Sequence, residues 1–240
     1  MRQKEDRYIL SGGLHLTINL HGIKASPWDV EALGMSAYEI VDYSEVALQQ
    51  ALKNFGHYTI KVNPLTDKRM LNEYGFYYCD TLIEPYCTID KLRAQIHCNA
   101  SISKEFDSDQ LLQICDGAFN YGRFHRDFNV NKTAANLRYE NWLNHLISDQ
   151  QVFALYWGNE LAGFVAHDHN SLVLHAVSEG FRGKGLAKYW WSEVMQALFF
   201  MGHKNVKSSI SASNLAALNL YASLGFSFKN PVDVYHRLII

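Results

Sequence analysis

The chain has 240 residues, of which 48% are hydrophobic and 19% are charged, with a formal net charge of −2 at pH 7. This balance predicts a folded chain of one or two domains and excludes extensive disorder. The near-neutral charge argues against a general nucleic-acid or membrane-surface binder, so any anionic ligand is expected to be small.

The four cysteines follow no disulfide or metal-binding pattern. They lie at irregular spacings, with no C-x-x-C pair and no matching histidines: Cys79, Cys87, Cys98 and Cys115. We expect buried free thiols, and metal binding or disulfides are the alternatives. The first ten residues lack the apolar core of a signal peptide, and no run approaches the roughly 18 apolar residues of a membrane span. A cytoplasmic protein without membrane insertion is therefore expected.

Residues 1–95 are predicted to form a small N-terminal α/β domain. Residues 14–20 (LHLTINL) alternate apolar and polar side chains, as a half-buried strand does. Strands are also predicted over 57–62 and 75–85, on either side of a short helix over 65–74. The Gly-Phe pair that follows this helix matches Gly225-Phe226 near the other end of the chain. This match suggests a partial structural repeat, and coincidence is the alternative.

Residues 96–240 are predicted to form a second, more regular α/β domain. Helices are expected over 107–119 and 131–147, and an antiparallel hairpin over 151–167 with its turn at residues 158–160. The remaining predicted elements are a strand over 171–177, a helix ending at Gly202, a strand over 205–212, a helix over 215–224 capped by Ser213 or Asn214, and a strand over 232–240. This order is typical of a mixed α/β fold.

The stretch FRGKGLAKYWW, residues 181–191, places Gly183 and Gly185 beside Arg182 and Lys184, directly before a predicted helix. The start of a helix presents unpaired backbone N–H groups and the positive end of the helix dipole, which together favour phosphate. The glycines would let phosphate oxygens reach those groups. The stretch is neither a Walker loop nor G-x-G-x-x-G, since Lys188 stands where the third glycine belongs. A tight strand-to-helix turn is the alternative.

The wider pattern resembles the Gcn5-related N-acetyltransferase (GNAT) superfamily. RGKGLA resembles its Arg/Gln-x-x-Gly-x-Gly/Ala signature at Arg182, Gly185 and Ala187, although alanine replaces the more common last glycine. The strand LHAV precedes this signature, and NLAALNLYASLGF, about thirty residues later, is similar to the second acyl-CoA segment of the superfamily. The resemblance implies a GNAT fold in residues 96–240, a largely antiparallel mixed sheet flanked by helices. It also implies acetyl-CoA or another short acyl-CoA as cosubstrate, and no metal.

The resemblance further implies which residues bind the cosubstrate. The pyrophosphate of CoA would be held by the backbone amides of Arg182, Gly183, Lys184, Gly185, Leu186 and Ala187. The pantetheine arm would pair with the main chain of His175, Ala176 and Val177, and Asn214 would lie beside it.

Tyr221 is the predicted catalytic residue. It lies seven residues after Asn214, so both side chains are expected on the same side of one helix. In many relatives the matching tyrosine protonates the departing CoA thiolate. The alternative is a packing tyrosine.

Two further catalytic groups are less defined. A main-chain N–H near Ala176 or Val177 is the expected oxyanion donor. The general base stays open among His175, Glu179, His167 and Asp168. The run of residues 167–169, His-Asp-His, lacks the further ligands of a zinc site.

Within the superfamily, the chain is similar to the acyltransferases of nucleotide-linked amino sugars, such as dTDP-fucosamine acetyltransferase. The segments that carry this similarity are PWDVEALGM, LNEYGFYYCDTLIE and NYGRFHRDFNVNKTAANLRYENWL. It implies transfer of an acetyl or larger acyl group, such as hydroxybutanoyl, to a dTDP-linked amino-dideoxyhexose for surface polysaccharide, as in O-antigen. Because arginine suits diphosphate and aromatic rings suit thymine, the candidate acceptor residues are Arg123, His125, Arg126 and Asp127. A solvated loop is the alternative.

Two other functions also fit the sequence. The same fold could acylate a protein, an antibiotic or a polyamine, or it could bind CoA as a regulatory module without turnover. A homodimer is compatible with the sequence.

Overall fold

The structure is a computed structural model that describes residues 22–240, so the strand predicted over residues 14–20 lies outside the described residues. The strands are β1 (Ile23–Ala25), β2 (Ala37–Ile40), β3 (Gly56–Val62), β4 (Tyr77–Thr88), β5 (Ala100–Ser103), β6 (Val152–Trp157), β7 (Glu160–Asp168), β8 (Ser171–Val177), β9 (Asn205–Ser208), β10 (Ile210–Ser211) and β11 (Ser227–Ile239). The helices are α1 (Pro27–Leu33), α2 (Glu45–Ala51), α3 (Arg69–Glu73), α4 (Ser108–Cys115), α5 (Lys132–Ser148), α6 (Ala187–Phe200) and α7 (Leu215–Ser223), and a 3-10 turn, η1, spans Glu179–Phe181.

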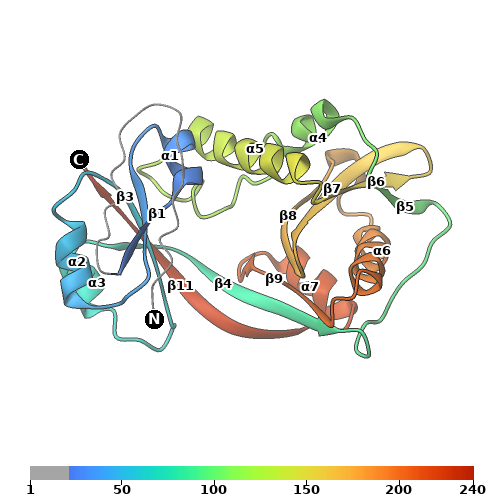
Figure 1. Cartoon of the computed structure of the whole chain (residues 1–240). Coiled ribbons are helices and arrows are strands. Elements are labelled where there is room, and N and C mark those ends of the chain that lie inside the picture. The colour runs from blue at the N-terminus through green and yellow to red at the C-terminus, as the bar shows by residue number, and fades with distance from the viewer. Residues whose placement is uncertain (1–21) are drawn as a thin grey trace, which may run out of the picture.

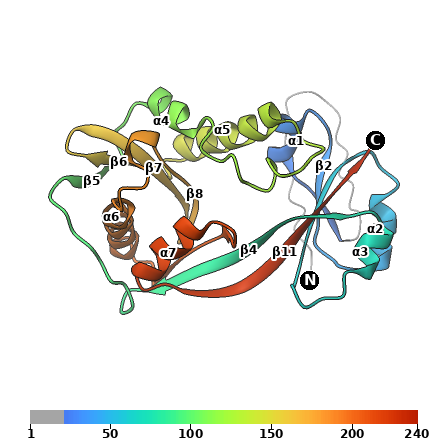
Figure 2. The ribbon, with the colours of Figure 1, turned by 180° about the vertical axis from the view of Figure 1, so that it is seen from behind.

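All the described strands belong to one sheet. Its order is β1-β2-β3-β11-β4-β9-β8-β7-β6-β5, and β10 pairs with β4 beside this path. Among the described strands, only β2–β3 and β8–β9 are parallel neighbours. The long strands β4 and β11 run side by side and join the two ends of the molecule (Figures 1 and 2). This mixed, largely antiparallel sheet with flanking helices confirms the predicted fold class.

Strands β6 and β7 bury both of their faces over most of their length, which explains their apolar sequences. On one face, Phe153 and Val165 pack into a core with α6 and α7. On the other face, Ala154 and Phe164 pack against α4 and α5. A third core, which includes Leu48, Tyr58 and other residues, lies around β1 to β3. Figure 1 shows these helices on opposite sides of the sheet.

The two ends of the sheet contain the same order of elements. Apart from the short elements η1 and β10, the series β2, α2, β3, α3, β4 and the series β8, α6, β9, α7, β11 each run strand, helix, parallel strand, helix, strand. The second helix ends in the same way in both. The N–H of Phe76 donates to the carbonyl of Leu71 (2.8 Å), and that of Phe226 donates to the carbonyl of Tyr221 (3.1 Å). These shared features support the predicted partial repeat and place Leu71 where the second series has Tyr221.

The predicted division into residues 1–95 and 96–240 stays a prediction. β11 lies in the second part by sequence but pairs with β3 and β4 of the first. The two parts therefore share one continuous sheet.

Most predicted elements are present, and the differences have local causes. The strand predicted over 205–212 is two strands, because the chain leaves β8 after Ser208 and Ile210 pairs with Ile83 on β4. The helix predicted over 107–119 ends at Cys115, shortly before Gly117, which has a φ of +68°. The sequence reading missed β1, α1, β2, α2 and β5, which have at most seven residues each.

The four cysteines are free thiols, as predicted. Three are buried, but the expectation of burial is wrong for Cys98, which is exposed between β4 and β5. Among residues 22–240, no helix is both long and apolar enough to cross a membrane.

Candidate functional site

β8 and β9 separate after a short paired segment. Their parallel pairing covers only Ser171 with Lys207 and Leu172 with Ser208. β8 then continues to Val177, while the segment that follows β9 turns away and pairs with β4 as β10. The second half of β8 therefore has no strand neighbour on this side, within the described sheet. An extended ligand could pair with its free main chain there.

The strand register shows which main-chain groups face this opening. The N–H of Ser178 donates to the carbonyl of Ala162 (2.8 Å), which makes Val177 and Gly163 a non-hydrogen-bonded pair of the antiparallel ladder. The main-chain groups of Val177 therefore point away from β7, and alternation gives His175 the same direction. Those of Ala176 point to β7. Of the three predicted residues, His175 thus directs both main-chain groups to the opening, and Val177 offers its N–H, while the Val177 carbonyl accepts a side-chain hydrogen bond from Arg182.

The glycine loop between β8 and α6 adopts a conformation that requires glycine. Gly183 has a φ of +73° and Gly185 a φ of +70°, values in the left-handed region that residues with a side chain rarely adopt. Leu186 precedes the first residue of α6, and no side chain caps this helix. The first turn of α6 also contains no acidic residue. The positive end of the helix dipole is therefore not neutralised by its own sequence.

Six consecutive backbone N–H groups at this loop have no acceptor within residues 22–240. Among the described residues, nothing accepts a hydrogen bond from the N–H groups of residues 183–188, whereas that of Arg182 donates to Glu179 (3.2 Å). The Arg182 side chain folds back, and its Nε donates to the carbonyl of Val177 (2.6 Å). An array of free N–H groups with lysines at 184 and 188 is suited to bind a phosphate or diphosphate.

Tyr221 lies in the core between α7 and β8 with its side chain fully buried. Its hydroxyl is 3.3 Å from Nε2 of His175, and Trp191 packs edge-on against the same imidazole. Burial lowers the pKa of His175 to about 4, so this imidazole is neutral at physiological pH. Burial also raises the pKa of Tyr221, against the opposing effect of Ser208 and Trp191, so the phenol keeps its proton.

Asn214 is the residue that caps α7, which decides between the two predicted caps. Its side-chain oxygen accepts the N–H of Ala217 (3.1 Å), and the residue is exposed at the start of the helix. Asn214 and Tyr221 thus lie two turns apart on α7, one at the surface and one in the core.

Two of the candidate general bases, His167 and Asp168, lie away from the opening. His167 and Asp168 pair with Leu172 and Ser171, at the end of β8 where the sheet is closed. Glu179 is exposed in η1.

The four predicted acceptor residues are not brought together. Arg123 lies beside the Asp29–Arg138 ion pair that joins α1 to α5, and His125 contacts Asn136 of α5 through Nε2 (2.7 Å). Arg126 points toward the turn that enters α7, where it pairs with Asp80 (2.5 Å). Asp127 points the other way, into the half of the sheet that contains β3. His125 and Asp127 thus contact other side chains inside the protein, whereas Arg126 reaches the surface.

The Asp127 carboxylate is the centre of a buried hydrogen-bond cluster. It accepts from His57 Nε2 (2.9 Å), His236 Nδ1 (2.7 Å) and the hydroxyl of Tyr77 (2.9 Å), and also from the N–H of Asn129. Burial by itself would raise the pKa of Asp127, but the hydrogen bonds from the two histidines hold that pKa well below its usual range. The cluster ties the loop before α5 to β3, β4 and β11.

By residue type, His57, Asp127 and His236 could hold a metal ion. Two ligands about 2.1 Å from one tetrahedral zinc would lie roughly 3.4 Å apart. The observed contacts of 2.7 and 2.9 Å are instead hydrogen-bond distances. The histidines are therefore bonded to the carboxylate in this structure.

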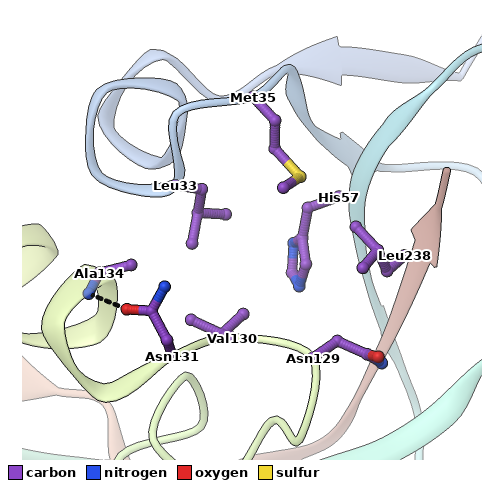
Figure 3. A pocket seen from close by; sticks show the side chains of 8 residues that line it. All are labelled: Leu33, Met35, His57, Asn129, Val130, Asn131, Ala134 and Leu238. Atoms are coloured by element: carbon purple, nitrogen blue, oxygen red, sulfur yellow. Dashed lines mark hydrogen bonds between the residues drawn. The ribbon is translucent and has the colours of Figure 1, made fainter.

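Figure 3 shows the pocket beside this cluster, with the His57 ring pointing into it. The pocket is lined by Leu33, Met35, His57, Asn129, Val130, Asn131, Ala134 and Leu238. Its cavity volume of about 50 Å³ is far below the several hundred Å³ of a typical ligand site. It has room for little more than water.

The sequence reading missed Asp80 and Ser211. Asp80 is almost fully buried on β4 and accepts the hydroxyl of Ser211 (2.8 Å) as well as Arg126. The available signal was an acidic residue inside the apolar strand YYCDTLIEP. Its position beside α7 depends on the pairing of β10 with β4, which no local pattern indicates.

Comparison with known proteins gives a consistent picture. The family model described as Acetyltransferase (GNAT) domain matches residues 110–236, more than half of the chain. The spore coat polysaccharide biosynthesis protein SpsD of Bacillus subtilis (strain 168) is 24% identical over 136 residues, which are 54% of this chain and 47% of that protein. The chain thus spans about half the length of this relative.

Several solved structures share the fold. A GCN5-related N-acetyltransferase from Sphaerobacter thermophilus has a TM-score of 0.62 at 12% identity, with 90% of this chain and 76% of that one covered. A conserved protein of unknown function from Staphylococcus epidermidis ATCC 12228 has a TM-score of 0.58 at 14% identity, with 88% and 89% covered. A tandem GNAT protein from the clavulanic acid biosynthesis pathway has a TM-score of 0.52 at 10% identity, with 84% and 75% covered.

Proposed function

Because the chain belongs to the GNAT acetyltransferase family, we propose that it is a CoA-dependent N-acyltransferase that acylates the amino group of a dTDP-linked amino sugar. The donor is acetyl-CoA or another short acyl-CoA. The similarity to SpsD, whose name places that protein in spore coat polysaccharide biosynthesis, supports a sugar acceptor over a peptide.

The observation that carries the proposal is the row of free N–H groups at residues 183–188, next to the unpaired half of β8. The loop would hold the CoA pyrophosphate by these N–H groups. The pantetheine would extend along β8 and pair with the main chain of His175, which leaves the N–H of Val177 for the reacting carbonyl. This path leads the thioester toward the side of β8 that faces Tyr221.

Transfer then requires one bond to form and one to break. The amine nitrogen attacks the thioester carbonyl, the new C–N bond forms, and the C–S bond breaks as the tetrahedral intermediate collapses. The N–H of Val177 points into the opening and would donate to the oxyanion, whereas the N–H of Ala176 is taken by β7. Tyr221 would give its proton to the leaving thiolate, so that CoA leaves as the thiol. The attacking amine releases one proton to solvent, and the phenolate of Tyr221 takes up one proton in return.

A screen of thiol release tests the proposal. Acetyl-CoA and hydroxybutanoyl-CoA should each be combined with dTDP-3-amino and dTDP-4-amino sugars, a polyamine, an aminoglycoside and a peptide amine. We expect the fastest release of CoA thiol with one of the dTDP-amino sugars. Faster thiol release with another amine would show that the acceptor belongs to that class of amine instead. Binding of acyl-CoA without any thiol release would favour a regulatory module.

A further inference from the structure

We propose that Asp80 and Arg126 form the acceptor site and select a ligand that carries both an amino group and an anionic group. This inference rests on the proposed function and names the recognition chemistry of its acceptor. It assigns Asp80 to the amino group and Arg126 to the anion.

Asp80 has one occupied and one free carboxylate oxygen. Oδ1 accepts the N–H of Thr81 (2.8 Å), the hydroxyl of Ser211 (2.8 Å) and Nη2 of Arg126 (2.5 Å). Among the described residues, none donates to Oδ2, although the side chain is only 3% exposed. Oδ2 is not among the fully buried polar atoms that lack a partner, so solvent reaches it, and each carboxylate oxygen can accept about two hydrogen bonds. Oδ2 is therefore ready to accept N–H groups from a ligand.

Arg126 is only partly used by the protein. Its Nη2 contacts Asp80 and the carbonyl of Cys79, while Nη1 makes one long contact of 3.4 Å to the hydroxyl of Ser213. Its Nε donates to no atom in the described chain. The side chain is 32% exposed, so its remaining N–H groups can reach an anion from solvent.

Hydrogen bonds place this pair beside the start of α7. The hydroxyls of Ser211 and Ser213 are 2.8 Å apart, and Ser213 directly precedes Asn214, the cap of α7. The N–H of Ala212 donates to the carbonyl of Thr81, the residue after Asp80 (2.7 Å). Figure 2 shows β4 passing close to α7. A ligand at Asp80 would thus lie next to the predicted pantetheine path.

The charges decide which acceptor fits. A polyamine would bring positive charge to Arg126, and a neutral sugar amine would leave its N–H groups without an anion. A nucleoside diphosphate that carries an amino sugar offers an ammonium or amine to Asp80 and a diphosphate to Arg126. Both halves of the site are then satisfied without breaking the ion pair between them.

A binding experiment with matched ligands separates the two assignments. The ligands are dTDP, a dTDP-amino sugar and the corresponding dTDP-sugar with a hydroxyl in place of the amine, measured by calorimetry in the presence of CoA. Arg126→Gln should lower the affinity for all three ligands by roughly tenfold or more. Asp80→Asn should weaken the binding of the dTDP-amino sugar alone, so that it binds no more tightly than the hydroxyl analogue.

Control variants come from the exposed Asp67–Arg69 ion pair, which has the same residue types and a distance of 2.6 Å. Asp67→Asn and Arg69→Gln should leave all three affinities unchanged. Thermal unfolding and acyl-CoA affinity report whether each variant is folded. If Asp80→Asn fails to fold, Ser211→Ala keeps the carboxylate, removes one of its donors and should selectively weaken the amino sugar.

The results distinguish this inference from the proposed function. If Asp80→Asn, or Ser211→Ala in its place, keeps the preference of the wild type for amine over hydroxyl, the role of Asp80 is wrong. If Arg126→Gln binds dTDP as tightly as the wild type, or if the accepted amine carries no anion, the selection by charge is wrong. Absence of thiol release by the wild type with every amine would instead refute the acyltransferase itself.

Discussion

The hydroxyl of Tyr221 lies 3.3 Å from Nε2 of His175, on the strand whose free main chain borders the opening beside β9. Both groups are uncharged at neutral pH, because burial lowers the pKa of the imidazole to about 4 and raises that of the phenol. The protein thus holds a protonated phenol beside the proposed thioester path. This arrangement suits a proton donor to a thiolate.

Tyr221→Phe tests the donor role. Phenylalanine keeps the packing of this fully buried ring and removes only the hydroxyl, so the fold and the acyl-CoA affinity should change little. We expect kcat to fall by roughly 10²-fold, the lower range for loss of a general acid. Steady-state kinetics and acyl-CoA titration measure the two effects. Unchanged turnover would remove Tyr221 from the mechanism and leave it as a packing residue.

Gly185→Ala tests the proposed binding of phosphate by the glycine loop. A Cβ at Gly185 would meet no atom within 4 Å, so any effect comes from the φ of +70°, which costs a residue with a side chain about 1 kcal/mol or more. The loop should relax, and acyl-CoA should bind several-fold more weakly. Gly180→Ala is the matched control, because Gly180 has equally open surroundings without a positive φ. Equal acyl-CoA affinities in both variants would contradict the proposed role of the loop.

Buried histidines predict a loss of stability in acid. Burial lowers the pKa values of His175 and His236 from 6.5 to about 4, so the unfolded chain binds more protons between these values. The contribution of these histidines to the free energy of unfolding is therefore fully present above about pH 6.5. It is lost as the pH drops toward 4, by up to about 3 kcal/mol for each histidine.

Urea unfolding between pH 4.5 and 7.5 measures this dependence. His175→Phe should reduce the proton uptake on unfolding near pH 5 by about one. His169→Gln, at an exposed position, provides the control. An unchanged slope in His175→Phe would show that this imidazole titrates alike in both states.

Asp127→Asn separates a structural role from the acceptor-binding role predicted from sequence. The carboxylate accepts hydrogen bonds from two buried histidines and Tyr77, so its loss should destabilise the fold by roughly 3 kcal/mol or more. Asp67→Asn at the surface should cost well under 1 kcal/mol. Urea unfolding at pH 7 compares the two variants. A stable Asp127→Asn that lost only acceptor affinity would restore the sequence-based interpretation.

The elements that could be predicted from sequence are those with a local signature. β8 has the predicted bounds, and α6 begins within the glycine loop that marked it. These signatures are apolar alternation, helical periodicity and glycines at turns. They depend only on neighbouring residues along the chain, so they can be recognised without knowledge of the tertiary structure. Short elements such as β1 and β2 carry too few residues for a period to appear.

The candidate site divides in the same way. The glycine loop, Asn214 and Tyr221 belong to one motif pattern and were predicted together. His125, Arg126 and Asp127 are neighbours in sequence, yet their side chains contact different partners. Successive residues of a loop point in different directions, so nearness in sequence did not mean a common site.

By itself, the amino-acid sequence determined the glycine loop, the helix after it and the tyrosine two turns beyond the cap of α7. These features depend on backbone conformation and spacing within short segments. Only the tertiary structure decided that β8 and β9 separate after Leu172, that Asp127 meets His57 and His236, and that Asp80 lies beside α7. Strand pairing brings these residues together from distant parts of the chain, and the free energy that selects it comes from burial summed over the whole sheet.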